Sequence, residues 1–144
     1  MGGNFPNIVE FETEKEYEEL FISEYIEKKF KTHDGININL KIGHFYHIFY
    51  RDKDKSTKYF DKWLARRIMQ LKAIVENWSG NIEIYEGYNK RSNRHERNYI
   101  YVYGKICVFL GQETSGDFYI ITAYQKNNKE LERLRKNKHI KRIV

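Results

Sequence analysis

The feature that most constrains the fold of this chain is a change in the period of its apolar residues near residue 80. In residues 60–78, apolar side chains recur every three or four positions, which is typical of an amphipathic helix. From residue 82 onward, short runs alternate apolar and polar residues, as half-buried β-strands do. Because short connections join most of these runs, we expect hairpins and hence an antiparallel sheet. The predicted strands are 82–87, 98–104, 105–111 and 118–124.

Helices are predicted on both sides of this region in the sequence. Residues 13–30 begin with Thr13 three positions before Glu16, the spacing of a capping box, and apolar residues then follow at helical spacing. The helix at 60–78 has Asp61 near its start, where a negative charge suits the helix dipole. Residues 127–137 are predicted to form a short terminal helix. The predicted fold class is α+β, with N-terminal helices packed on one face of a four-stranded antiparallel β-sheet.

The segments between these elements are predicted from turn residues and alternation. The sequence "THDG" at 32–35 is typical of a turn. Residues 36–42 place Ile or Leu at every second position and are predicted to form a half-buried strand, which Gly43 interrupts. The charged stretch "RDKDKSTK", 51–58, is predicted to be an exposed loop, and a long basic loop, "YNKRSNRHER", connects the first two strands of the sheet.

Charge is unevenly distributed along a chain of 144 residues, a length that suits one domain, 1–144. Residues 1–34 hold four Lys and nine acidic residues, a balance of −5, and form an acidic helical leader. Residues 35–144 hold 22 Lys and Arg and 11 acidic residues, a balance of +11. A basic body of this kind attracts polyanions, of which nucleic acid is the commonest. The alternative is that these cations are only solvated surface.

Several classes of protein are disfavoured by what the sequence lacks. No 18-residue apolar window predicts a membrane span, and the first residues do not resemble a secretory signal. The single cysteine, Cys107, excludes an internal disulfide and fits a cytoplasmic protein, in which it is a buried small hydrophobe. There is no glycine-rich phosphate loop, no Cys/His metal spacing and no nucleophile elbow. We therefore expect no cofactor and no metal.

The candidate chemistry lies in "GHFYHIFYRDKDK", 43–55, which places His44 and His47 three residues apart among aromatics. Histidine titrates near neutrality, so the pair suggests acid–base catalysis or a metal, although no carboxylate or thiolate set completes a zinc site. Together with Arg, Lys, Tyr and Thr on a basic body, histidine suits RNA cleavage without a metal. A neutral imidazole takes the proton of a ribose 2′-OH, the oxygen attacks phosphorus, and cations stabilise the phosphorane.

Three elements occur in an order that resembles a known family: the His47–Ile48 step, a following helix with Arg66 and Arg67, and a final strand "FYIITAYQKN". Over residues 40–137 the chain is similar to the barnase/EndoU/colicin/RelE-like ribonuclease superfamily, especially its small phage-associated branch. The resemblance implies a toxin-like or phage-associated endoribonuclease acting on tRNA or mRNA. It also implies an acidic antitoxin or immunity protein, whose charge would match a basic cleft.

Carried over to this chain, the family pattern implies His47 as base or acid, with His44 as its partner. Arg67 lies between two apolar positions of the helix stripe, so it is favoured over Arg66 to stabilise the phosphorane. Thr122 and Tyr124 would position the phosphate. The chain departs from the pattern where some relatives have a second His, because Arg51 occupies that place, and where relatives have Pro before the first sheet strand. The predicted RNA-binding residues are Arg51, Arg66, Lys90, Arg91, Arg94, Arg97 and Lys126.

Each of these assignments has a structural alternative. His47 can instead be a core imidazole in an aromatic cluster. Thr122 and Tyr124 alternate in phase with Ile120, which can mean core packing or a cleft. Tyrosines 99, 101 and 103 share one strand face, which can be a half-exposed sheet face or a platform for stacking bases. The rival function is a non-catalytic nucleic-acid-binding or protein-binding module with a degraded nuclease fold, and it predicts that His47, Arg67 and Tyr124 do not meet.

Overall fold

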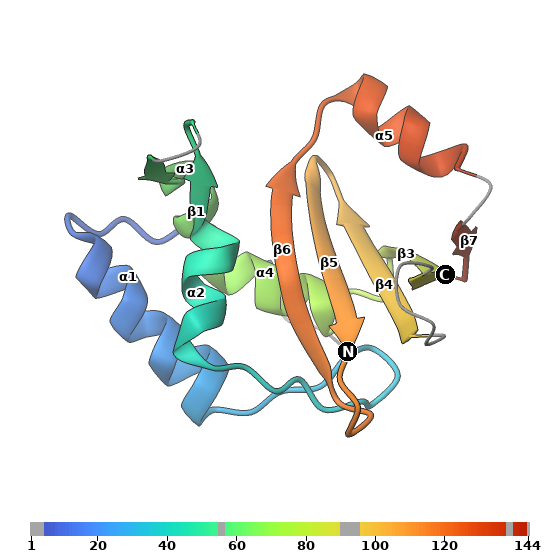
Figure 1. Ribbon diagram of the computed structural model, residues 1–144, viewed down its shortest axis with the longest axis horizontal. Helices are drawn as coiled ribbons and strands as arrows, with labels where there is room; N and C mark the ends of the chain where they lie inside the picture. Colours follow the sequence, from blue (N-terminus) through green and yellow to red (C-terminus); the bar gives the residue numbers. More distant parts are fainter. Residues whose placement is uncertain (1–4, 55–56, 90–95, 138–139, 144) are drawn as a thin grey trace.

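A five-stranded antiparallel sheet is the centre of the computed structural model, which describes residues 5–54, 57–89, 96–137 and 140–143 (Figure 1). Its strand order is β6-β5-β4-β3-β7. The predicted α+β class and the four predicted strands are confirmed, and a fifth short strand at the sheet edge was not predicted. The strands are β3 (Glu83–Asn89), β4 (Glu96–Tyr103), β5 (Ile106–Gln112), β6 (Phe118–Gln125) and β7 (Ile140–Arg142).

Helices cover both faces of this sheet: the N-terminal helices pack on one face, as predicted, and the terminal helix covers the other. The inner face packs against the helices that precede β3, whereas Leu131 of the terminal helix packs on the outer face against Tyr85, Val102 and Cys107. The helix that follows β6 has to cross one face of the sheet to bring the chain back to the β3 edge, where β7 pairs. The helices are α1 (Glu14–Phe21), a π-helix (Ile22–Glu27), α2 (Ile42–Phe49), α3 (Lys62–Ala65), α4 (Ile68–Val75) and α5 (Asn128–Arg135).

The main core lies between the inner face and the N-terminal helices. Alternate strand residues such as Ile84, Val108 and Ile120 are fully buried there against helix residues such as Phe45 and Leu71. The acidic leader contributes to the same core through its apolar stripe, while its charged residues stay on the surface. Its buried apolar residues, among those described, are Tyr17, Phe21, Tyr25 and Phe30.

The first predicted helix begins as expected and then changes type. The backbone N–H of Glu16 donates to Thr13 Oγ1 at 3.3 Å, and the N–H of Thr13 donates to the Glu16 carboxylate at 3.2 Å, which confirms the capping box. From Ile22 the helix widens to π geometry, a form usually associated with local constraints. Here the constraints are tertiary, because Tyr25 donates to the Ile68 carbonyl and Lys72 Nζ donates to the Glu24 carbonyl at 3.1 Å.

The predicted strand at 36–42 is wrong. This segment forms only single bridges, Lys31 with Asn37 and Ile38 with Phe118, and the chain is already helical at Ile42. Ile38 and Leu40 are buried as the alternation predicted, but Ile42 is 40% exposed. An extended segment that lies against the sheet buries alternate side chains even when it is not a paired strand. The alternation of apolar residues therefore did not distinguish a strand from an unpaired extended segment.

The second predicted helix is divided into α3 and α4 at Arg66 and Arg67, where the N–H of Arg67 donates to the Leu64 carbonyl at 2.9 Å. Asp61 caps the first piece, because its Oδ1 accepts the N–H of Leu64 at 3.0 Å. The stretch 51–58 was predicted to be a loop, but its two ends belong to paired strands, β1 (Tyr50–Asp52) and β2 (Lys58–Phe60), which form a hairpin. The predicted helix at 127–137 is confirmed as α5.

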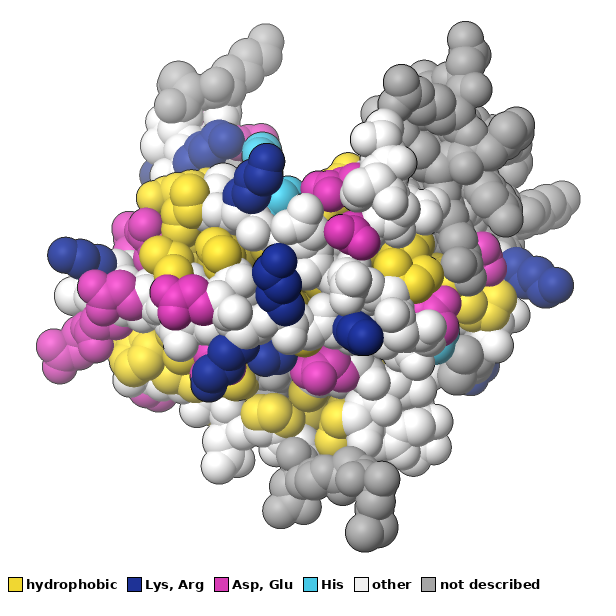
Figure 2. Space-filling view, turned by 90° about the horizontal axis from the view of Figure 1, so that it is seen from below, with side chains coloured by type: hydrophobic (Ala, Val, Ile, Leu, Met, Phe, Trp, Pro, Cys, Tyr) yellow, Lys and Arg dark blue, Asp and Glu magenta, His cyan; other side chains and the backbone are white. Residues whose placement is uncertain are grey.

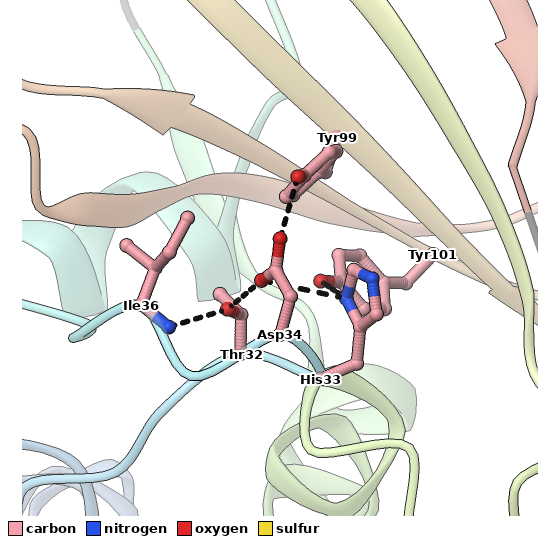
Figure 3. Close-up of polar contacts among 6 residues, drawn as sticks. All are labelled: Thr32, His33, Asp34, Ile36, Tyr99 and Tyr101. Carbon is pink, nitrogen blue, oxygen red and sulfur yellow. Dashed lines mark hydrogen bonds and ion pairs between the residues drawn. The ribbon is translucent and has the colours of Figure 1, made fainter.

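Two tyrosines of β4, Tyr99 and Tyr101, support the turn at 32–35 and are too buried to stack on bases, while Tyr103 packs against Phe5 and Trp78. Tyr99 and Tyr101 are fully buried, and their hydroxyls contact the turn: Tyr99 donates to Asp34 at 2.7 Å, and Tyr101 lies 2.5 Å from Nδ1 of His33 (Figure 3). Thr32 in turn donates to Asp34 at 2.5 Å. Buried hydroxyls need such partners, so these tyrosines anchor the turn to the sheet.

Candidate functional site

A groove of about 530 Å³ lies between α2, the β1–β2 hairpin and the edge strand β6. It brings together residues that are more than 70 positions apart in the sequence. Four of the residues predicted for catalysis or RNA binding line it: His47, Arg51, Thr122 and Tyr124. Its lining residues are Tyr46, His47, Tyr50, Arg51, Asp52, Lys58, Tyr59, Ile121, Thr122 and Tyr124.

A β-bulge in β6 directs Thr122 and Tyr124 away from the core. Leu110 of β5 pairs with Ile120, but its neighbour Phe109 pairs with Thr122, so Ile121 is an extra residue in β6. An extra residue reverses the alternation beyond it. Ile120 therefore points into the core, while Thr122 and Tyr124 lie on the outer face beside Phe109. The core-packing alternative for these two residues, which assumed an unbroken alternation, does not hold.

Arg51 connects the hairpin to this outer face. Its Nε donates to Asp61 at 3.2 Å, its Nη1 donates to Thr122 Oγ1 at 3.3 Å, and its Nη2 donates to the carbonyl of Ala123. The guanidinium carbon lies 4.5 Å from the centroid of the Tyr124 ring, a cation–π geometry. The side chain is only 14% exposed. Arg51 is thus a positioned cation at the base of the groove.

His47 lies on the exposed side of α2 and lines the groove, so the alternative of a buried core imidazole is wrong. Its neighbours Ile48 and Phe49 face the core and are fully buried. The helix places His44 one turn earlier on a related face, but His44 is not among the lining residues.

His44 instead caps the start of α2. Its Nδ1 accepts the backbone N–H of Lys41 at 2.9 Å, and its ring lies 5.5 Å from the ring of Tyr119. Burial is the main cause that lowers the pKa of His44, and the nearby His47 lowers it further. These contacts give His44 a structural role in holding α2 against β6.

The wall of the groove formed by α2 meets the acidic helix α1. Tyr50 donates to Glu14 at 3.0 Å, and Tyr46 donates to Glu18 at 3.3 Å. Burial and the bond to Glu14 raise the pKa of Tyr50 to about 12. Acidic side chains gather at the α1 end of the face in Figure 2, and Lys and Arg side chains lie nearer the middle. A polyanion in the groove is therefore repelled from the α1 side.

Arg67 does not reach the groove. Its Nη1 donates to the Trp63 carbonyl at 2.7 Å, and its guanidinium stacks on the Trp63 ring at 3.8 Å, so it folds back along its own helix. Arg66 pairs with Glu10 at 3.0 Å, also outside the groove. The prediction assumed an uninterrupted helical stripe, whereas the helix is divided between α3 and α4 at these two residues. Of the three residues chosen to test the site, His47 and Tyr124 meet and Arg67 does not.

The remaining predicted RNA-binding residues are divided between described and undescribed parts of the chain. Lys126 Nζ lies 5.3 Å from the Tyr124 ring centroid, just beyond the groove, and 3.8 Å from Glu130. Lys90, Arg91 and Arg94 lie outside the described residues, and so does the side chain of Arg97.

Sequence reasoning missed the other six lining residues of the groove, namely Tyr46, Tyr50, Asp52, Lys58, Tyr59 and Ile121. Lys58 and Tyr59 lie on β2, which pairs with Asp52 and Arg51 of β1. The signal available was the aromatic residue at each end of the charged stretch, since Tyr50 and Phe60 pair across the hairpin. Four of the exposed large apolar side chains found in the described residues line this groove, namely Tyr46, Tyr59, Ile121 and Tyr124.

The described residues contain no cluster of three or more His, Cys, Asp or Glu side chains that can bind a metal. Cys107 is buried on the outer face of the sheet, and burial raises the pKa of its thiol to about 11. None of the described helices is both long and apolar enough to cross a membrane. No family model matches the chain, and no curated protein or solved structure is significantly similar to it.

Proposed function

We propose that the protein is a metal-independent endoribonuclease whose active site is the groove between α2, the β1–β2 hairpin and β6. The observation that supports this most strongly is the convergence of His47, Arg51, Thr122 and Tyr124 in one groove. The set contains an imidazole, a positioned cation and two hydroxyls, which are the groups that phosphodiester cleavage through a 2′-OH requires. The proposal includes the barnase/RelE-like nuclease fold and an RNA target such as tRNA or mRNA.

Arg51 and Thr122 form the phosphate-binding part of this site. One hydrogen on each terminal nitrogen of Arg51 is used within the protein, which leaves one on each for a phosphate oxygen. Thr122 Oγ1 accepts a hydrogen bond from Arg51, so its own hydroxyl hydrogen can point into the groove and donate to the same phosphate. Charge-assisted bonds of this kind are the strong ones.

Cleavage then requires two proton transfers. His47 takes the proton of the ribose 2′-OH, and the oxygen forms a bond to phosphorus. The bond from phosphorus to the 5′ oxygen of the next nucleotide breaks, and that oxygen takes a proton from a second group. Lys58 and Tyr124 are two of the proton-bearing side chains on the other walls of the groove, and we propose them as candidates for this group. The products are a 2′,3′-cyclic phosphate and a free 5′-OH, and DNA is not cleaved because it has no 2′-OH.

The exposed tyrosines fit single-stranded RNA. Tyr46 is 46% exposed, Tyr59 51% and Tyr124 39%. Aromatic side chains around a cationic groove stack on unpaired bases, with about 1–3 kcal/mol per base. If the protein acts as a toxin, its inhibitor is an acidic protein that covers this groove.

A second candidate is an RNA-binding module that does not cleave. One observation favours it: among the described residues, His47 is the single imidazole that lines the groove, and Arg67 is directed elsewhere. Binding requires the cations and the tyrosines but not a proton acceptor, so the two candidates differ in what they require of His47.

A pair of histidine variants separates the candidates. The purified protein is incubated with total tRNA and with RNA oligonucleotides in excess EDTA, and the new 3′ ends are analysed for cyclic phosphate. His47→Ala should lower the cleavage rate by about 10²-fold or more. His44→Ala is the matched control on the same helix, and it should keep most of the activity at pH 7.5. Full activity of a folded His47→Ala protein would contradict the mechanism, and RNA binding without any cleavage by the wild type would support the binding module.

A further inference from the structure

A second pocket of about 310 Å³ lies on the outer face of the sheet, beneath α5. Its apolar part is formed by Ile100 of β4, Phe109 of β5 and Leu134 of α5. Its polar part includes two cations, Lys126 and Arg133. Glu130 and Asn137 complete the lining. The pocket therefore combines an apolar surface that suits a flat base with cations that suit a phosphate.

The pocket lies next to the groove, because one lining residue of each is in contact with the other. The ring of Phe109, which lines the pocket, lies 5.8 Å from the ring of Tyr124, which lines the groove, in an edge-to-face arrangement at 74°. Lys126 lies close to both rings, with its Nζ 5.3 Å from the centroid of the Tyr124 ring and 5.9 Å from that of the Phe109 ring. A single strand that leaves the groove across Tyr124 meets Lys126 and then the pocket.

We propose that this pocket is a subsite for a nucleotide that flanks the cleaved bond, so that the substrate is a single-stranded RNA longer than a dinucleotide. The inference rests on the proposed function of the groove. The flanking base stacks on Phe109 and packs against Ile100 and Leu134, and its phosphates lie near Lys126 and Arg133. Stacking on an aromatic ring together with contacts to the backbone cations is the usual mode of single-strand binding.

The acidic residue of the pocket makes Arg133 the residue to test. Glu130 lies 3.8 Å from Lys126 and so neutralises part of its charge, although the pair is partly exposed and weak. Glu130 is itself held in the capping box of α5, with its backbone N–H donating to Asn127 at 2.9 Å. Arg133 is exposed near the C-terminal end of α5. Lys129 is exposed on the same helix and does not line the pocket, so it provides a matched control.

The test measures binding and cleavage of RNA oligonucleotides of two to six nucleotides, extended on either side of one scissile step. Binding is measured by fluorescence anisotropy with a 2′-deoxy substitution at that step, which prevents cleavage. The wild type should bind the six-nucleotide RNA about tenfold or more tightly than the dinucleotide. Arg133→Ala should remove most of that gain and leave dinucleotide binding unchanged, whereas Lys129→Ala should change neither by more than about twofold.

The outcomes separate the subsite from the catalytic proposal. If Arg133→Ala and Lys129→Ala have the same effect, or if affinity does not depend on length, the subsite is wrong even where the unmodified RNA is cleaved. If the length dependence and the Arg133 effect are present but no RNA is cleaved, the pocket is a binding site for single-stranded RNA and the catalytic proposal falls. Absence of binding to every oligonucleotide, or binding of DNA of the same length with equal affinity and no length effect, overturns the subsite.

Discussion

The removal of Arg51 should destabilise the protein strongly, because this side chain joins two parts of the fold. Its guanidinium bonds to Asp61 beside the hairpin and to both Thr122 and the Ala123 carbonyl in β6. Hydrogen bonds that involve a charged group contribute about 1.5–3 kcal/mol each, and a buried acceptor left without a partner costs about 1–3 kcal/mol. Asp61 and Thr122 are partly exposed and regain water, which reduces the loss. We expect Arg51→Ala to lower the free energy of unfolding by about 2–4 kcal/mol.

Urea unfolding monitored by tryptophan fluorescence measures this loss. With an m-value of about 1.5 kcal/mol/M, a loss of 3 kcal/mol moves the midpoint by about 2 M. Arg51→Lys keeps the charge but loses the planar fork, so it should recover no more than about half of the stability. The control is Lys58→Ala, which removes an exposed cation from the same groove and should change the stability by about 0.5 kcal/mol or less.

The reasoning is refuted if Arg51→Ala is no more destabilising than Lys58→Ala at an unchanged m-value. Asp61→Asn provides an independent check, because asparagine also caps a helix well while the charge facing Arg51 is lost. If Arg51 acts through that pair, the effects of Asp61→Asn and Arg51→Ala should be less than additive.

Three other predictions follow from the titratable groups. The pKa of His44 is lowered in the folded protein, so the free energy that this residue contributes to stability should be present above the ordinary histidine pKa and lost as pH falls through the lowered value. The difference in unfolding free energy between wild type and His44→Ala, measured with urea, should therefore shrink from pH 7.5 to pH 5. Glu14→Gln should bring the pKa of Tyr50 down from about 12 in an NMR titration, and the stability that the raised pKa provides below pH 10 should be lost as pH rises toward 12. The thiol of Cys107, with a pKa of about 11, should react with a disulfide reagent at pH 8 about 10²-fold more slowly than in the urea-unfolded chain, since the thiolate is the reactive form.

The four main strands and the first and last helices could be predicted, because residues close together in the sequence determine them. The capping box at Thr13, the strands from residue 82 and the helix after Asn127 depend on residues close together in the sequence. The strand predicted at 36–42 failed because burial of Ile38 and Leu40 requires only an extended chain beside the sheet. The break at Arg66 and Arg67 leaves the apolar stripe almost unchanged, so the stripe did not reveal it.

The types of residue in the groove could be predicted from the sequence, but the distant segments that contribute them could not. His47 and Tyr124 were chosen for their chemistry, and they do line one groove. Arg67 was predicted to be the cation that stabilises the phosphorane. Arg51 occupies that place instead, because the β1–β2 hairpin positions it against Thr122 and Ala123 of β6. The orientation of Thr122 depends on a bulge at Ile121. The strand sequence did not show where the alternation reverses, because Ile120 and Ile121 are both apolar.

The same contacts that shape the groove also bear on how the protein avoids association through its sheet. β6 is an edge strand, and the backbone groups of an open edge invite pairing with another chain. At its first residue, Phe118 exchanges backbone hydrogen bonds with Asn37 and Asn39, at 2.9 and 2.8 Å. Near its end, Arg51 takes the carbonyl of Ala123, and the bulge at Ile121 interrupts the regular ladder between them. The edge of β6 therefore has no long regular stretch with which a second molecule can pair. The Arg51 bond and the bulge, which form the groove, also protect the protein against edge-to-edge aggregation.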